Sequence, residues 1–268
     1  MTISTQRITV SHLQKMKQQA EKITCLTAYD ASFADTLSQA GIEVLLVGDT
    51  LGMVVAGHTT TIPVTMQDMV YHIHNVARAK PTSLILADMP FMAYHNTDIA
   101  LKNAIKLMQA GGEMIKMEGG AWLTPIVQAL NQQGIPVCAH LGLTPQSVHL
   151  LGGYKIQGRP PEQAKQIMND ALALQQAGAK LLVLECVPYE LAQAITKEVL
   201  IPVIGIGAGP YCDGQVLVTP DMLGLTNKQF KFTHNFLLNQ HDGIQGAVKE
   251  YIRRVKNAEF PTLEHSFT

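Results

Sequence analysis

Short runs of apolar residues recur along the chain, and a glycine often stands a few positions before them. Gln39-Ala40-Gly41 precedes the run at 44–47, and Gln176-Ala177-Gly178 precedes the run at 181–184. Such a glycine is typical of a helix end, because the left-handed conformation found there is unfavourable for residues with a Cβ atom. Continuous apolar runs are typical of strands buried on both faces of a parallel sheet. The pattern therefore predicts a repeated unit of helix, turn and strand.

The runs give eight candidate strands, at residues 23–27, 44–47, 84–87, 114–117, 136–139, 181–184, 203–206 and 215–218. Helical periodicity lies between most of them. One helix is expected over 65–79, where Thr65-x-x-Asp68 resembles a capping box. Another is expected behind a Thr97 cap, and a third begins with Pro160-Pro161, which suit a first turn.

Eight strand–helix units in 268 residues predict a single-domain (β/α)₈ TIM barrel. The domain is expected to span 1–268, with an N-terminal helical extension and C-terminal helices. Only residues 207–214 separate the last two strands, so a single turn rather than a full helix is expected there. A doubly wound open sheet is the alternative, although it usually has fewer strands.

Composition and charge exclude several classes of protein. Hydrophobic residues make up 47% of the chain and charged residues 15%, which excludes a disordered chain and favours a surface partly covered by other subunits. A net charge of −1 without a basic stripe argues against nucleic-acid binding. We expect no membrane span and no secretory signal. The four cysteines are far apart, which favours reduced thiols and a cytoplasmic location.

Ionisable residues stand at the ends of five successive predicted strands. In chain order they are Asp49, Asp88, Lys116 with Glu118, His140 and Glu185. A TIM barrel carries its active site at this edge. Buried unpaired carboxylates are costly and raise one another's pKa, so the carboxylates on neighbouring strands are expected to share a cation. Oxygen ligands without cysteine suit Mg²⁺ better than Zn²⁺.

Other features of this edge have two readings each. Lys116 and Glu118 are two residues apart and therefore point to the same side of their strand, either as a structural ion pair or as part of the site. A lone histidine such as His140 is as often structural as functional. The Gly205-Ile206-Gly207-Ala208-Gly209 stretch permits close approach of a ligand, although tight barrel packing is favoured. Asp30 is interpreted as a helix N-cap.

The residues around these strand ends resemble the ketopantoate hydroxymethyltransferase family. The similar segments, in order, are Leu26-Thr27-Ala28-Tyr29-Asp30, Val47-Gly48-Asp49-Thr50-Leu51-Gly52-Met53, Ala87-Asp88-Met89-Pro90-Phe91, Ile115-Lys116-Met117-Glu118-Gly119-Gly120, His140-Leu141-Gly142-Leu143-Thr144-Pro145-Gln146 and Cys212-Asp213-Gly214-Gln215-Val216-Leu217-Val218. The resemblance runs from about Ile8 to about Tyr251. Each segment alone is weakly specific, whereas the ordered set is highly specific.

The resemblance implies a TIM barrel, assembled as a homodecamer, that acts in pantothenate and coenzyme A biosynthesis. The family reaction transfers a hydroxymethyl group from methylene-tetrahydrofolate to 3-methyl-2-oxobutanoate (α-ketoisovalerate), with Mg²⁺ stabilising an enolate. By position, the resemblance assigns Mg²⁺ to Asp49, Asp88 and Glu118, the oxo acid to Asp49, Thr50, Asp88 and Lys116, and the proton acceptor to Glu185. His140 is expected to hydrogen-bond in the same region.

This chain departs from the family pattern in two places. Thr50 stands where the family usually has serine, which keeps the hydroxyl and narrows the pocket slightly. Thr219-Pro220-Asp221 replaces a form that carries a histidine, so the resemblance says less about the folate side of the site.

Three other functions remain open at this point. Magnesium-dependent barrels of the phosphoenolpyruvate mutase and isocitrate lyase type also bind oxo acids through carboxylates. A metal-free aldolase would instead use Lys116 as a Schiff-base lysine. A non-catalytic barrel scaffold would fit the low charge, but it leaves the group of carboxylates without a purpose.

Overall fold

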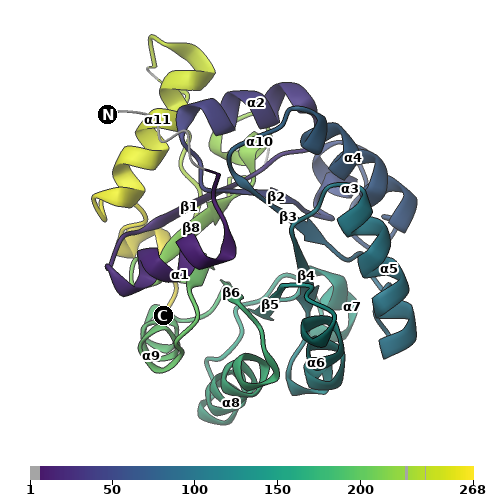
Figure 1. Cartoon of the computed structure of the whole chain (residues 1–268). Coiled ribbons are helices and arrows are strands. Elements are labelled where there is room, and N and C mark those ends of the chain that lie inside the picture. The colour runs from purple at the N-terminus through teal and green to yellow at the C-terminus, as the bar shows by residue number, and fades with distance from the viewer. Residues whose placement is uncertain (1–6, 227–228, 239) are drawn as a thin grey trace.

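Eight parallel strands close into a barrel in sequence order, which confirms the predicted fold class (Figure 1). The computed structural model describes residues 7–226, 229–238 and 240–268. Residues 1–6 of the predicted N-terminal extension lie outside this part. The strands are β1 (Ile23–Thr27), β2 (Val44–Val47), β3 (Leu84–Asp88), β4 (Met114–Glu118), β5 (Val137–Gly142), β6 (Leu181–Glu185), β7 (Val203–Ile206) and β8 (Gly214–Leu217).

Helices surround the barrel, as the apolar periodicity between the strands predicts. They are α1 (Val10–Gln18), α2 (Ala31–Ala40), α3 (Leu51–Val54), α4 (Met66–Arg78), α5 (Thr97–Gln109), α6 (Thr124–Gln132), α7 (Val148–Leu151), α8 (Pro161–Ala177), α9 (Tyr189–Glu198), α10 (Thr219–Met222) and α11 (Gly243–Lys256). Three short 3₁₀ helices, η1 (Ala121–Leu123), η2 (Pro145–Ser147) and η3 (Leu263–His265), complete the order.

The helix ends follow the local chemistry of the sequence, with one correction. Thr65 and Asp68 form the predicted capping box of α4, and Asp30 caps α2 as expected. Thr97, however, is the first residue inside α5, and the N-cap is Asn96, whose side chain accepts a hydrogen bond from the Ile99 backbone N–H at 2.9 Å. Asparagine is among the strongest N-cap residues, so it takes this place from the adjacent threonine.

Four strands, β3, β4, β5 and β6, end later than the apolar pattern predicts. β3, β4 and β6 each include the carboxylate that follows the last apolar residue. These residues are part of the barrel ladder, where Asp88 pairs with Lys116 and Glu118 pairs with His140. The ladder therefore fixes the position of the charged side chains at the rim. β8 begins and ends one residue earlier than predicted.

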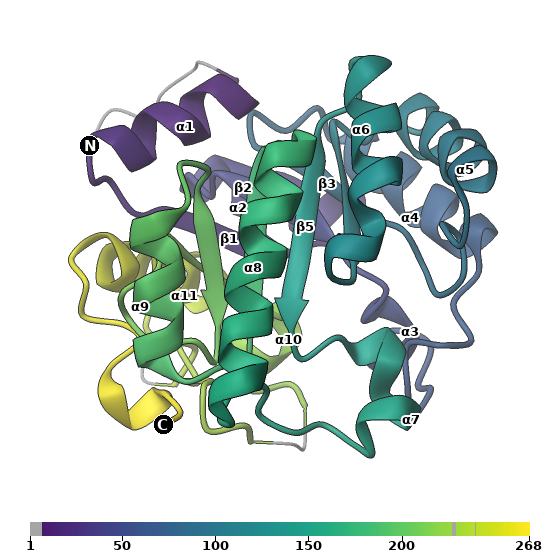
Figure 2. The same ribbon diagram turned by 90° about the horizontal axis from the view of Figure 1, so that it is seen from below.

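Helix α1 covers the end of the barrel where the strands begin. Its Leu13 and Met16 are buried among the side chains that fill the lower barrel, including Ile23 and Val44. Figure 2 shows α1 at this end, and the short helices α3, α7 and α10 at the opposite end, toward which the strands point. The barrel is thus closed below and carries its loops and short helices above.

The connection between β7 and β8 is a turn without a helix, as its length predicts. A Cβ atom at Gly205 would lie 2.8 Å from the Cys212 sulfur, and one at Gly209 would lie 2.5 Å from the Cβ of Tyr189. These contacts support the tight-packing interpretation of the glycine stretch. On the outer side, α11 packs against α2 and β1.

Among the helices of the described ranges, none has the length and apolar character that crossing a membrane requires.

Candidate active site

Three carboxylates from neighbouring strands meet at the upper rim of the barrel. Asp49 follows β2, Asp88 ends β3 and Glu118 ends β4, and their side chains are buried, with 2%, 1% and 4% of the residue surface exposed. One oxygen from each lies within 4.8 Å of the others, a grouping that can hold a metal ion. The predicted convergence of these residues is therefore observed.

Lys116 supplies positive charge within this group. Its Nζ lies 2.7 and 2.9 Å from the two carboxylate oxygens of Asp88 and 3.4 Å from Oε1 of Glu118. Burial alone would lower the pKa of Lys116, but the surrounding carboxylates raise it well above its ordinary value. Lys116 is therefore a buried ammonium ion that compensates Asp88 and Glu118.

Asp49 is the least compensated of the three carboxylates. Burial raises its pKa well above the ordinary value, and the charges of Asp88 and Glu118 raise it further. Its Oδ2 accepts a hydrogen bond at 2.9 Å from the side-chain amide of Gln146, a neutral group. An additional positive charge at the rim would therefore stabilise the ionised form of Asp49.

His140, on β5, connects the carboxylates to Glu185 at the end of β6. Its Nδ1 lies 3.2 Å from Glu118 Oε1, and its Nε2 lies 3.2 Å from Glu185 Oε2. Among the described residues Nε2 has no well-aligned hydrogen-bond partner. Burial and Lys116 favour the neutral imidazole, but the contacts with Glu118 and Glu185 raise the pKa of His140 to about 9.

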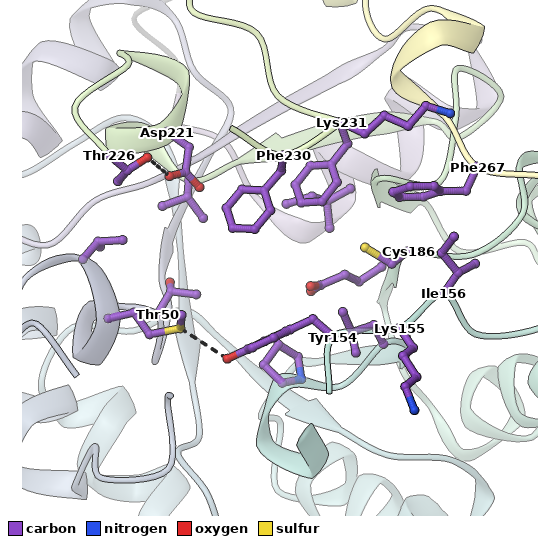
Figure 3. Close-up of a pocket in the computed structure, with 18 of the residues that line it drawn as sticks. Thr50, Tyr154, Lys155, Ile156, Cys186, Asp221, Thr226, Phe230, Lys231 and Phe267 are labelled. Carbon is purple, nitrogen blue, oxygen red and sulfur yellow. Dashed lines mark hydrogen bonds between the residues drawn. The ribbon is translucent and has the colours of Figure 1, made fainter. Parts of the chain in front are cut away.

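A cavity of about 940 Å³ opens next to these residues. Thr50 and Glu185 line it, so the cavity adjoins Asp49 along the chain and His140 through the Glu185 carboxylate. Figure 3 shows Phe230 and Phe267 projecting toward the cavity, while the ammonium ends of Lys155 and Lys231 point away from it. Tyr154 reaches across to Met53, with its hydroxyl 3.7 Å from the sulfur.

Sequence reasoning missed two buried residues beside the carboxylates. Gln146 follows β5 and bonds to Asp49 and Glu118, and the Tyr94 hydroxyl bonds to Gln146. Gln146 belongs to one of the segments that carry the family resemblance, which is the signal that could have found it. Tyr94 lies in the loop between β3 and α5, outside those segments.

Comparison with known proteins assigns the family. The family model described as ketopantoate hydroxymethyltransferase matches residues 7–263. The chain belongs to this family. It is 56% identical over 263 residues to 3-methyl-2-oxobutanoate hydroxymethyltransferase 2 of Pseudomonas fluorescens, covering 97% of this chain and 98% of the relative. The enzyme of that name from Psychromonas ingrahamii is 56% identical over 262 residues, covering 97% and 99%.

Solved structures show the same fold at low sequence identity. Phosphonopyruvate hydrolase, in complex with oxalate and Mg²⁺, has a TM-score of 0.61 at 12% identity, covering 78% of this chain and 80% of its own. A 2,3-dimethylmalate lyase of the phosphoenolpyruvate mutase/isocitrate lyase superfamily has a TM-score of 0.53 at 17% identity, covering 73% and 70%. The family match makes this chain a transferase rather than a lyase or a scaffold.

Proposed function

We propose that this transferase moves a hydroxymethyl group from methylene-tetrahydrofolate to 3-methyl-2-oxobutanoate, forming ketopantoate, with Mg²⁺ as its metal cofactor. The observation that carries the proposal is the buried group of Asp49, Asp88 and Glu118 beside a large cavity, in a chain of this family. Relatives that share 56% of their residues with the chain are named for the same oxo acid.

The donor atoms suit Mg²⁺. They are carboxylate oxygens, which hard cations prefer, and they lie within 4.8 Å of one another. Because Mg–O distances are about 2.1 Å, oxygens on one ion lie at most about 4.2 Å apart, so the three side chains would close by no more than about 0.6 Å to share it. Bound at Asp49, Asp88 and Glu118, Mg²⁺ supplies a Lewis acid that stabilises negative charge on the keto oxygen of the substrate.

Thr50, Lys116 and His140 are the proposed contacts of the oxo acid, together with Asp49 and Asp88. Thr50 lines the cavity, and its hydroxyl lies 2.8 Å from the Tyr29 hydroxyl, which restrains its rotation. The ammonium group of Lys116 offsets the negative charge of the bound acid. Nε2 of His140 offers a donor that the described residues leave poorly satisfied.

Glu185 is the proposed proton acceptor. Its side chain is 17% exposed, lines the cavity, and places Oε2 at 3.2 Å from Nε2 of His140. The Glu185 carboxylate takes the proton from the branched carbon of the oxo acid, and the C–H electron pair enters the enolate. That carbon then bonds to the one-carbon unit as the first of its two bonds to folate nitrogens breaks. Water displaces the second nitrogen and supplies the hydroxyl oxygen of the product, and the proton held by Glu185 and the remaining water proton go to the two nitrogens of tetrahydrofolate.

The cavity is the proposed place for the folate donor. Its volume of about 940 Å³ lies at the upper end of the range for small-molecule sites. Phe230, Phe232 and Phe267 line it, and the first two rings stack with centroids 5.4 Å apart and planes 9° apart. Flat faces of this kind suit a heteroaromatic ring.

We also propose that the chain acts in the cytoplasm as a homodecamer. Exposed apolar side chains on its outer surface, among them Trp122, Leu150 and Leu200, support burial against other subunits. Sedimentation should then give a mass about ten times the 29.2 kDa of one chain.

Deuterium exchange at the branched carbon of 3-methyl-2-oxobutanoate tests substrate, metal and base together. In D₂O without folate, the enzyme should replace this proton by deuterium when Mg²⁺ is present. The exchange should stop when EDTA removes the metal. Glu185→Gln should bind the oxo acid but not exchange it, whereas the matched variant Glu162→Gln, on the exposed start of α8, should exchange normally. Normal exchange by Glu185→Gln would assign the base to another residue. Borohydride should trap no imine on Lys116.

A further inference from the structure

Gln146 lies in the loop after β5 and contacts two of the three carboxylates. Its side-chain Nε2 donates to Asp49 Oδ2 at 2.9 Å and to the Met89 carbonyl at 2.8 Å. Its backbone N–H donates to Glu118 Oε2 at 3.0 Å. Only 5% of the residue is exposed, so these bonds are shielded from water.

The surrounding groups determine which way the Gln146 amide points. The Met89 carbonyl and an ionised Asp49 carboxylate are acceptors only, so both must face the NH₂ end of the amide. At the other end, Oε1 accepts a hydrogen bond at 2.6 Å from the Tyr94 hydroxyl. The Glu118 backbone N–H donates to that same hydroxyl at 3.2 Å. A reversed amide would place acceptor against acceptor, so a single orientation is favoured.

These bonds join the ends of three strands through one residue. The Gln146 side chain holds Asp49 after β2 and the backbone that follows Asp88 in β3, while its main chain holds Glu118 in β4. Because the three carboxylates repel one another, each needs a restraint to stay in place before a cation arrives. Lys116 restrains Asp88 and Glu118 by charge. Gln146 restrains Asp49 without adding charge.

We propose that Gln146 is a positioning residue that holds Asp49 and Glu118 ready for a divalent cation, and that Tyr94 fixes the Gln146 amide for this task. The inference rests on the metal site of the proposed function. Residues that orient metal ligands typically change metal affinity about 10- to 100-fold when they are replaced.

The test is binding of Mg²⁺ and Mn²⁺ alone to the full-length protein, measured by calorimetry without substrate. Gln146→Met keeps the length and volume of the side chain but removes its hydrogen bonds to Asp49, Met89 and Tyr94, while the backbone bond to Glu118 stays. We expect its metal affinity to fall at least about tenfold. At subsaturating metal its turnover should be low, and raising the metal concentration should restore most of it.

The matched control is Gln215→Met. Gln215 is equally buried, with 4% exposed, and its amide donates to the Gly209 carbonyl at 3.1 Å, away from the carboxylates. This variant should lose thermal stability to a similar degree yet bind the metal as the wild type does. Equal loss of metal affinity in both variants would show that Gln146 acts only through general stability and would overturn the proposal.

Tyr94→Phe provides a second test that keeps Gln146 in place, and it decides the question if Gln146→Met does not fold. We expect Tyr94→Phe to lower the metal affinity several-fold. In the double variant with Gln146→Met, the fold-loss in metal affinity should be smaller than the product of the two single fold-losses. If the wild type binds the metal and both single variants bind it within twofold of the wild type, Gln146 has no positioning role. If the wild type itself binds no divalent cation, the metal site of the proposed function fails instead.

Discussion

Replacement of Lys116 by methionine tests the electrostatics of the site directly. The change removes the ammonium group that contacts Asp88 and Glu118, in a place where the three side chains are only 5%, 1% and 2% exposed. Removing one partner of a buried ion pair typically costs about 3–5 kcal/mol, because the remaining charge stays buried without its counter-charge. For a chain of 268 residues, this predicts a thermal midpoint lower by about 5–9 °C in EDTA at pH 8.

The loss of stability in Lys116→Met, relative to the wild type, should depend on pH and on the presence of Mg²⁺. Burial raises the carboxylate pKa values, and Lys116 opposes this effect at both Asp88 and Glu118. In the variant the pKa of Asp88, already raised by burial, therefore rises further, and the pKa of Glu118 rises because burial is no longer offset by Lys116. Such groups favour folding below their unfolded pKa, about 4, and this contribution is lost as pH rises through the folded-state pKa. The deficit should thus be smaller at pH 5 than at pH 8, and Mg²⁺ should reduce it by restoring positive charge.

Unfolding followed by circular dichroism at pH 5 and pH 8, in EDTA and in Mg²⁺, measures these quantities. The matched control is Lys165→Met, which removes a lysine from the exposed face of α8 and should unfold with the wild type under all four conditions. The reasoning is refuted if Lys116→Met also matches the wild type in EDTA at pH 8, or if neither lower pH nor Mg²⁺ narrows its deficit.

Three further predictions concern neighbouring residues. Gly142→Ala should lower the free energy of urea unfolding by about 2–5 kcal/mol, because φ is +91° and the new Cβ would lie 2.3 Å from the Glu185 carbonyl oxygen. The control Gly134→Ala, at φ +75° with open space around the new Cβ, should lower it by only about 1 kcal/mol. The pKa of His140 is raised to about 9, so in EDTA the protonated His140 stabilises the folded protein fully below about pH 6.5, and this contribution is lost toward pH 9. The difference in unfolding free energy between wild type and His140→Gln should therefore shrink between about pH 6.5 and pH 9. A difference that stays constant over this range contradicts the prediction. Thr50→Ser keeps the hydroxyl beside Tyr29 and should hold the KM for the oxo acid near wild type, whereas Thr50→Val should raise it at least about tenfold; equal KM values would exclude a role for the hydroxyl.

Much of the fold could be predicted because the apolar runs and the glycines before them repeat with the barrel units. The errors fall where local pattern and tertiary pairing compete. Asp88 and Glu118 stand one residue beyond the predicted apolar runs, whereas ladder pairing with the next strand includes them in β3 and β4. Thr97 and Asn96 are both good N-caps, and only the backbone shows that Asn96 has the extended conformation of a cap.

The carboxylates of the site could be predicted because barrel topology alone places consecutive strand ends together. Their hydrogen-bond partners could not, because those come from loops. Gln146 meets Asp49 across 97 positions of sequence, and Tyr94 meets Gln146 across 52. No local periodicity encodes such contacts, since they depend on the path that each loop takes over the rim.

The register of the barrel explains how so many ionisable groups stay buried at one place. Pairing of β3 with β4 sets Asp88 beside Lys116, and pairing of β4 with β5 sets Glu118 beside His140, so positive and negative groups alternate around the rim. Asp49 breaks this alternation, because its hydrogen bond comes from the neutral amide of Gln146. The rim therefore lacks positive charge beside Asp49, within reach of Asp88 and Glu118, and a divalent cation bound there would stabilise the ionised form of Asp49.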